Sequence, residues 1–406
     1  MPFVIYAAPW FSENNVRNIE AIVNLPDVRL GVISQEPLER LSPHLRGRIA
    51  AHWGVADILD SGQLTHAAQA LSHHLGPIHR LFSAQEQLQV PLAQVRERLG
   101  IPGMSVEAAH NFRDKGRMKY LFREAGIPCA RSRLVTSGAD AWHFADEVGY
   151  PLVVKPVAGA ASQATFRIDR PEALHEALQV AAPSHNQPVL IEEFITGDES
   201  SFETFSLHGE SVWHSLTHYY PSPLEVLRTP WIQWTVVLPR EVDHPRYDDI
   251  RTVAARALKV LGMGTGLSHM EWFRRHDGSI AISEVAARPP GAQFTTLMSV
   301  AHDFDCIQAW ARLMVFDHFD PPSRRFAAGA AYLRGQGQGR IKAIHGLDQA
   351  QREVGPMVVA AKLPQIGQQT SSSYEGDGYI IVRHPDTEVV RQALLRLVSI
   401  IQIELT

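Results

Sequence analysis

One segment of the chain, residues 266–292, constrains the fold more than any other. Apolar and polar residues alternate on both sides of Asp277 and Gly278, and this dipeptide is typical of a two-residue hairpin turn. Counting outward from such a turn places Glu271 directly opposite Glu284. The segment therefore predicts an antiparallel hairpin with two carboxylates on one face.

Two carboxylates that face each other across a sheet lie roughly 5 Å apart and repel each other. A cation between them relieves the repulsion, and Mg²⁺ usually binds through one or two carboxylates and the phosphates of a substrate. Arg288, which follows Glu284 in the chain, adds a fork-shaped binder for a phosphate or an oxyanion. Glu271 and Glu284 are therefore predicted metal ligands, although a surface hairpin with two solvated glutamates explains this segment alone nearly as well.

The bulk properties of the chain exclude several classes of protein. A length of 406 residues exceeds one hydrophobic core, so two or three domains are expected. The net charge of −5 and the lack of basic runs argue against nucleic-acid binding. Two cysteines, Cys129 and Cys306, exclude a disulfide scaffold and a cysteine-based zinc site. Without a secretory signal or a membrane-spanning stretch, we expect a soluble, cytoplasmic protein that binds no membrane.

Lysine is rare in this chain and occurs only at positions 115, 119, 155, 259, 342 and 362. We expect lysines to persist where a compact ammonium group is needed, although a genomic bias would give the same imbalance. Lys155 ends a short apolar strand and precedes a loop of small residues, 157–163. Such a loop lets backbone N–H groups approach an anion closely. A structural lysine at a strand end explains Lys155 alone equally well.

Acidic residues follow a second predicted strand, 189–195, and include Glu199. Backbone that leaves a sheet can offer N–H and C=O groups to the edge of an adenine ring. A carboxylate several residues further on can accept hydrogen bonds from both ribose hydroxyls. A solvated acidic turn is the simpler explanation of this segment alone.

Taken together, these segments resemble the ATP-grasp superfamily from about residue 100 to 320. Residues 107–126 predict one helix, and the run from Arg113 to Pro128 is similar to the family's first nucleotide-binding segment. Residues 152–159 are similar to its second segment, and residues 189–199 to its adenine- and ribose-binding segment. Each motif is weak alone, but the motifs occur in the family's order at suitable separations.

The resemblance implies an ATP site with Mg²⁺, for which Mn²⁺ can substitute. Glu271 and Glu284 match the family's metal-binding acids, and Glu199 matches its ribose-binding acid. Two lysines match the phosphate-binding residues, and the segment from Glu192 to Ile195 matches the adenine-binding residues. The residues implied to bind the nucleotide are Lys119, Lys155, Ser162, Glu192, Glu193, Phe194, Ile195 and Glu199.

The implied fold is an ATP-grasp fold of mixed α/β and α+β class. It consists of an N-terminal parallel α/β domain over residues 1–106 and a mobile lid subdomain over 107–186. A large subdomain with the metal site covers 187–324, and a β-rich α+β subdomain covers 325–406.

One position departs from the common family pattern E-x-N-x-R. This chain has Glu284-x-Ala286-x-Arg288, and the hairpin register places His269 opposite Ala286, in the space that the asparagine leaves. The pattern, followed by Pro-Pro-Gly, resembles the branch that contains L-amino-acid ligases, which join amino acids into dipeptides. In that branch the arginine at the position of Arg288 contacts phosphate and the developing oxyanion.

The resemblance implies an ATP-dependent acid–amino-acid ligase. ATP would phosphorylate a substrate carboxylate to an acyl phosphate, and attack by an amine would give an amide, ADP and phosphate. The substrates are expected to be small carboxylates and amines, above all amino acids. Lys155 and Arg288 are the expected catalytic residues, because they neutralise developing charge. His269 is a candidate base in its neutral form, and orienting Glu271 is an equally good role for it.

Substrate recognition is expected in residues 213–234, an aromatic-rich stretch that resembles a long functional loop, although packing beneath a loop explains it equally well. Glu203, His218 and Arg228 are polar candidates. Two other functions stay open: a carboxyphosphate-forming enzyme similar to biotin carboxylases, and a nucleotide-binding regulator without catalysis. A homodimer is compatible with the sequence.

Overall fold

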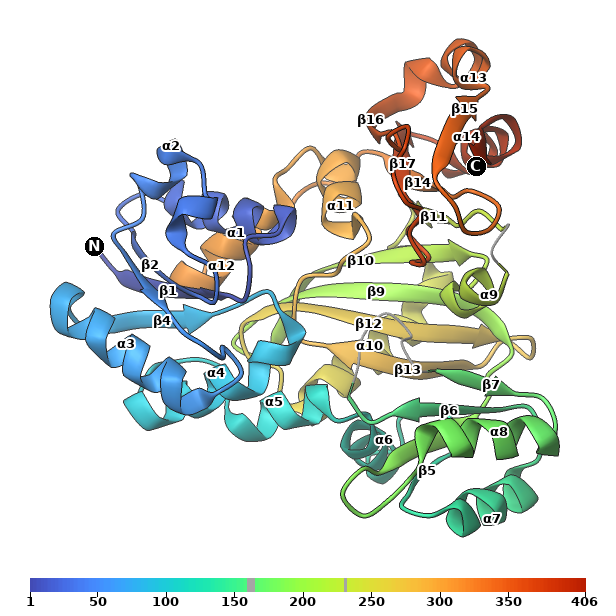
Figure 1. Cartoon of the computed structure of the whole chain (residues 1–406), viewed down its shortest axis with the longest axis horizontal. Coiled ribbons are helices and arrows are strands. Elements are labelled where there is room, and N and C mark those ends of the chain that lie inside the picture. Colours follow the sequence, from blue (N-terminus) through green and yellow to red (C-terminus); the bar gives the residue numbers. More distant parts are fainter. Residues whose placement is uncertain (159–164, 230–231) are drawn as a thin grey trace.

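The computed structural model describes residues 1–158, 165–229 and 232–406 (Figure 1). The chain begins with a four-stranded parallel sheet of order β3-β2-β1-β4, which confirms the predicted parallel α/β layer. Buried residues of β1 and β2 meet helix residues in the core of this layer. Its elements are β1 (Phe3–Ala8), α1 (Glu13–Val23), β2 (Arg29–Ser34), α2 (Pro43–Arg46), β3 (Ala51–Gly54), α3 (Ser61–Leu75), β4 (Ile78–Phe82) and α4 (Gln89–Leu99).

Two helices, α5 (Val106–Arg113) and α6 (Lys115–Glu124), replace the single helix predicted over residues 107–126. They separate at Asp114, which has an extended backbone and accepts a hydrogen bond from the Arg117 N–H at 2.9 Å. Aspartate side chains compete in this way with the helical hydrogen-bond ladder and favour a new N-terminus. The break sets the direction in which α6 presents its lysines.

A small four-stranded antiparallel sheet follows, of order β5-β8-β6-β7. Apolar side chains of α7 and α8 pack against it. The sheet includes β8, so it extends past the boundary predicted at residue 186, because β8 pairs with both β5 and β6. Its elements are β5 (Ser132–Val135), α7 (Gly138–Val148), β6 (Leu152–Pro156), β7 (Phe166–Ile168), α8 (Pro171–Ala181) and β8 (Val189–Glu193).

The centre of the molecule is an eight-stranded antiparallel sheet of order β13-β12-β9-β10-β11-β14-β17-β16 (Figure 1). The boundary predicted at residue 324 therefore does not separate two sheets, because β14 hydrogen-bonds to β11. The strands are β9 (Gly197–Leu207), β10 (Glu210–Tyr220), β11 (Thr235–Leu238), β12 (Gly266–Arg275), β13 (Ile280–Ala286), β14 (Ala327–Leu333), β16 (Val358–Lys362) and β17 (Gly378–His384).

The remaining elements cover this sheet and complete the C-terminal part. They are the helices α9 (Pro223–Arg228), α10 (Asp248–Leu261), α11 (Phe294–His302), α12 (Cys306–Phe316), α13 (Leu347–Glu353) and α14 (Thr387–Ile400), and the strand pair β15 (Ile341–His345) and β18 (Gln402–Leu405). Across the three described ranges, no helix has both the length and the apolar character needed to cross a membrane.

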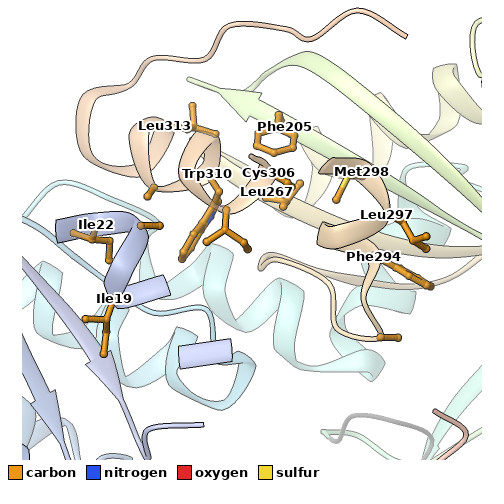
Figure 2. Close-up of a cluster of buried hydrophobic side chains, with 14 of the residues drawn as sticks. Ile19, Ile22, Phe205, Leu267, Phe294, Leu297, Met298, Cys306, Trp310 and Leu313 are labelled. Atoms are coloured by element: carbon orange, nitrogen blue, oxygen red, sulfur yellow. The ribbon is translucent and has the colours of Figure 1, made fainter. Parts of the chain in front are cut away.

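One apolar cluster joins the N-terminal domain to the large sheet (Figure 2). Ile19 and Ile22 of α1 lie beside Trp310 of α12, and Phe205 and Leu267 extend the cluster onto strands β9 and β12. Trp310 is buried at 2% exposure. Side chains of this size dominate the energetics of burial, so this cluster fixes how the two parts meet.

The hairpin of β12 and β13 has the predicted partners but a different turn. Arg275 N–H donates to Ser279 O at 2.8 Å, so the connection contains three residues and ends at Gly278 with φ +85°. Three-residue hairpin loops commonly end on such a left-handed residue. A register shift after Glu271 compensates for the extra residue and restores the pairing of Glu271 with Glu284.

Candidate functional site

A cleft of about 420 Å³ is lined by the N-terminal domain, both later sheets and the C-terminal part. Ser162 lies outside the described residues. Every other residue predicted to bind nucleotide or metal, or to act in catalysis, lines this cleft: Lys119, Lys155, Glu192, Glu193, Phe194, Ile195, Glu199, His269, Glu271, Glu284 and Arg288. The tertiary structure thus brings together segments that are far apart in the sequence.

Two lysines and one glutamate form a buried charge cluster at the end of the small sheet. Lys119 of α6 and Lys155 of β6 both pair with Glu192 of β8, and the Lys119–Glu192 distance is 3.6 Å. Burial raises the pKa of the Glu192 carboxyl, but the two ammonium charges outweigh burial and hold this pKa below its usual value. Because two ammonium groups share one carboxylate, the cluster keeps an excess of positive charge that suits a phosphate. The adenine contact predicted for the Glu192 side chain competes with these ion pairs.

Lys115 is a site residue that the sequence argument did not assign. Its Nζ lies 2.8 Å from Oε1 of Glu284, and its side chain is buried. Its backbone N–H donates to Val157 O at 3.0 Å, which ties the start of α6 to the loop after β6. The available signal was its place among the three lysines between residues 115 and 155.

The predicted metal ligands Glu271 and Glu284 each lie next to a basic side chain. His269 Nδ1 lies 2.8 Å from Oε1 of Glu203, and its Nε2 lies 3.7 Å from Oε1 of Glu271. Burial lowers the pKa of His269, but contacts with these two glutamates outweigh burial and raise it to about 9. At neutral pH the imidazole is then protonated, which argues against a neutral base and supports its alternative role of orienting Glu271. Lys115 and His269 therefore relieve the repulsion between Glu271 and Glu284.

The donor set at the acids fits a divalent cation that shares its coordination with a substrate. Glu271 and Glu284 are direct cross-strand partners and both line the cleft. Among the described residues no group of three His, Cys, Asp or Glu side chains could hold a metal ion by itself. Mg²⁺ characteristically uses one or two carboxylates and takes its other ligands from phosphates and water. The residues therefore fit this ion in the presence of a nucleotide.

Glu199 of β9 faces the same acidic region. Burial and the charge of Glu271 raise the pKa of the Glu199 carboxyl well above its usual value. Its backbone pairs with Phe273 of β12, two residues along the strand from Glu271. The predicted ribose ligand thus lies in the cleft, directly after the predicted adenine segment.

Arg288 is held by a residue from the N-terminal domain. Its Nε and Nη2 donate to Oε2 of Glu86 at 3.1 and 2.9 Å, while Arg113 Nη1 donates to Oε1 of the same carboxylate at 2.9 Å. Glu86 is buried and lines the cleft. Sequence reasoning missed Glu86, because no motif marks an isolated glutamate as the partner of an arginine 202 positions away.

Residues 213–234 are a strand and a short helix for much of their length, not the predicted long loop. β10 continues to Tyr220, and α9 follows at Pro223–Arg228. Two of the predicted aromatic residues, Tyr219 and Trp234, line the cleft with their rings edge-on at 5.6 Å. Trp213 instead packs into the apolar core.

The other members of the predicted substrate group lie elsewhere. Trp231 is outside the described residues, and Tyr220 is exposed. The imidazole of His218 forms hydrogen bonds with the side chains of Ser200 and Tyr247, and His218 does not line the cleft. Arg228 lies 3.5 Å from Asp169 of the small-sheet region, and Glu203 is buried against His269. These three polar side chains are therefore engaged within the protein.

Two parts of the cleft wall were not foreseen from the sequence. One is a face of α1 that contains Asn14, Arg17 and Asn18, and the other is the C-terminal pair Tyr374 and Glu375. Neither segment carries a recognisable motif, so only the tertiary structure shows that they reach the cleft.

Comparison with known proteins agrees with this geometry. Residues 120–302 match the ATP-grasp domain family. The L-arginine-specific L-amino acid ligase of Bacillus subtilis is 24% identical over 55% of this chain and 54% of its own length. The alanine–anticapsin ligase of Bacillus subtilis strain 168 is 27% identical over 50% of this chain and 46% of its own length. The chain thus spans about half the length of the curated relatives it matches.

A solved structure extends the similarity of fold to the whole chain. The L-amino acid ligase from Bacillus licheniformis superposes with a TM-score of 0.79 at 18% identity, covering 100% of this chain and 99% of that one. The resemblance to the ATP-grasp superfamily is confirmed: residues 120–302 form an ATP-grasp domain, and the chain has the ATP-grasp fold.

Proposed function

We propose that this protein is an ATP-dependent carboxylate–amine ligase that joins amino-acid-like substrates through an acyl phosphate. The supporting observation is the side-by-side placement of a buried cationic cluster and a pair of acids in one cleft. Lys119 and Lys155 supply positive charge for a triphosphate, and Glu271 and Glu284 supply oxygen ligands for its divalent cation. Phosphoryl transfer depends mainly on such positioning and charge neutralisation. The names of the similar proteins favour the same chemistry.

The nucleotide would lie along the junction of the small and large sheets. The backbone from Glu193 to Ile195 would meet the adenine edge, and Glu199 would accept the ribose hydroxyls. Lys119 and Lys155 would bind the phosphates, together with Ser162. Glu192 would hold the two ammonium groups at the spacing that the structure shows.

A magnesium ion, or a manganese ion in its place, would be held by Glu271 and Glu284 and would neutralise phosphate charge. Lys115 and His269 would keep these two carboxylates in position, because Lys115 contacts Glu284 and His269 contacts Glu271.

The reaction would proceed in two balanced steps. A carboxylate oxygen of the acyl substrate attacks the γ-phosphorus of ATP, and ADP leaves. The neutral amine of the second substrate then attacks the acyl carbon, the acyl–oxygen bond breaks, and the leaving phosphate takes up the proton that the amine loses as the amide forms. Arg288 would stabilise the oxygen that becomes negative during the attack. Exclusion of water from the cleft would protect the acyl phosphate from hydrolysis.

A pairwise screen of amino acids tests this proposal. The wild-type protein, ATP and Mg²⁺ are incubated with each pair, and phosphate release is measured together with the product masses. Phosphate release that requires both amino acids, with a product of the dehydrated dipeptide mass, is the expected result. Phosphate release that requires bicarbonate alone would favour carboxyphosphate chemistry, and ATP binding without phosphate release from any pair would favour a regulator. Either outcome overturns the proposal.

A further inference from the structure

Two charged side chains in the cleft wall face it without an oppositely charged partner among the described residues. Arg17 of α1 has one hydrogen bond, from Nη1 to Oγ1 of Thr296 at 3.5 Å, which is at the limit for such a bond. Glu375 follows β16 in the chain and precedes β17, and in residues 1–158, 165–229 and 232–406 no cation pairs with its carboxylate. Both side chains are half-buried at the cleft, so each offers a charge that a substrate group of opposite charge can pair with.

Arg17 belongs to a face of α1 that lines this cleft. Arg17 and Asn18 follow Asn14 by three and four residues, which places all three on one face of the helix. All three side chains line the cleft. Asn18 is 3% exposed and donates from Nδ2 to the Tyr6 hydroxyl at 2.9 Å. This anchoring fixes the helix face, so the guanidinium of Arg17 is presented from a rigid element.

Glu375 is presented by the aromatic wall on the C-terminal side. The ring of its neighbour Tyr374 lies edge-on to Trp234 at 4.8 Å, and Trp234 stacks on Tyr332 at 4.6 Å. The Tyr374 hydroxyl is within electrostatic reach of Glu271 and Arg288. Glu375 therefore lines the same cleft as Tyr374, Trp234 and Arg288.

The proposed chemistry specifies which substrate groups need a partner. Two amino acids bring two carboxylates and two amines. One carboxylate becomes the acyl phosphate beside Arg288, so the other needs a second cation. One amine must be neutral in order to attack, so the amine that stays charged throughout belongs to the acyl substrate.

We propose that Arg17 binds the carboxylate of the amine substrate and that Glu375 binds the ammonium group of the acyl substrate. This inference rests on the ligase function proposed above. It assigns the amine substrate to the side of the cleft near Arg17 and the acyl substrate to the side near Glu375. It makes Arg17 and Glu375 specificity-determining residues that require a free carboxylate on one substrate and a free ammonium group on the other.

Substrates with blocked charges provide the test. Arg17→Met keeps most of the side-chain stem and removes the charge. We expect it to raise the KM for an amino acid used as amine substrate by roughly 10- to 100-fold, the range for a charge-assisted hydrogen bond. The KM for the corresponding amino amide, which lacks the carboxylate, should stay unchanged, as should the KM for ATP. Arg17→Lys should recover part of the loss.

Glu375→Gln is examined in the same way with the acyl substrate. We expect a rise in KM of the same order for the free amino acid, and no change for its N-acetyl derivative. Arg40→Met and Glu210→Gln are matched controls, because both side chains are exposed and neither lines the cleft. Both controls should behave as the wild type.

The outcomes separate the two proposals. Equal loss with the charged and the blocked substrate, or an unchanged KM in both variants while the wild type ligates amino acids, overturns the inference and leaves the ligase function in place. Absence of phosphate release by the wild type with every amino-acid pair overturns the ligase function and, with it, the inference. An unchanged KM for ATP shows that the variants fold.

Discussion

At the scale of single residues, buried charges are the main feature of the cleft. Lys119, Lys155 and Glu192 lie almost out of contact with solvent, at exposures of 1, 8 and 5%. Such groups are tolerated when ion pairs and hydrogen bonds compensate for lost hydration, and Lys119 gains a further bond to Ile282 O at 3.1 Å. Two lysines share one carboxylate in this cluster, and Oε2 of Glu192 lies 3.6 Å from the Lys119 ammonium, beyond hydrogen-bond distance. An anion that binds both lysines would therefore balance the remaining positive charge.

Glu284→Gln tests the metal role of the acid pair. Glutamine keeps the side-chain volume and leaves an oxygen that can accept from Lys115, so the fold should be unaffected. Removal of one negative ligand should lower the rate of phosphate release by about 100-fold, which corresponds to about 3 kcal/mol of transition-state stabilisation. The apparent affinity for Mg²⁺ should weaken in parallel. Rates at several magnesium concentrations and thermal unfolding measure both effects, and near-normal turnover would remove Glu284 from the metal site.

The hairpin of β12 and β13 shows how an element positions these charges. Cross-strand pairing places Glu271 beside Glu284 and His269 beside Ala286, while β9 supplies Glu203 on the other side of β12. The side chains alternate between the faces of the sheet, so one register brings the acids to the cleft and a shift by one residue would bury them. The bulge after Glu271 is therefore part of the site, because it corrects the register set by the longer turn.

Two glycines next to this hairpin make a matched pair of substitutions. A Cβ at Gly197, which has φ +152°, would lie 2.2 Å from the backbone oxygen of Arg274. A Cβ at Gly278, with φ +85°, would meet no atom within 4 Å. We expect Gly278→Ala to cost about 1 kcal/mol through backbone strain alone, with the KM for ATP unchanged.

Gly197→Ala should be more harmful, because β9 must move away from β12 next to the predicted adenine segment. We expect a larger loss of stability and a clear rise in the KM for ATP. Urea unfolding and ATP kinetics of the two variants provide the comparison. Equal effects of both substitutions would show that close strand contact at Gly197 does not position the nucleotide segment.

At the scale of the whole molecule, the N-terminal domain contributes directly to the cleft. The shared core around Trp310 fixes this domain against the large sheet, and Glu86 then reaches across to Arg288 and Arg113. A carboxylate that binds two nitrogens of one guanidinium fixes its plane. The orientation of Arg288 thus depends on the packing of two parts of the chain.

Glu86→Gln tests this dependence. The amide cannot bind two cationic guanidinium groups as strongly, so Arg288 should be held less firmly at the acyl carbon. We expect kcat to fall by roughly 10- to 100-fold, in line with the cost of a misplaced catalytic group, while the KM for ATP changes little. Steady-state kinetics with both substrates measure this difference. A rise in the KM for ATP with an unchanged kcat would contradict a positioning role.

Local patterns in the sequence determined the elements and motifs of this protein. Alternation around Asp277 and Gly278 predicts the hairpin, and the spacing of acids along it predicts the Glu271–Glu284 pair without knowledge of any other segment. These features depend on backbone periodicity and turn preference, which act between near neighbours.

Tertiary structure decided the partners. Glu86 meets Arg288, Arg17 and Glu375 reach one cleft, and Lys115 pairs with Glu284, although long stretches of chain separate them. The sheet boundaries followed the same rule, since β8 and β14 join sheets through hydrogen bonds to distant strands. Such contacts arise because burial and charge pairing act between groups close in space, and no local pattern encodes which distant residue will be the neighbour.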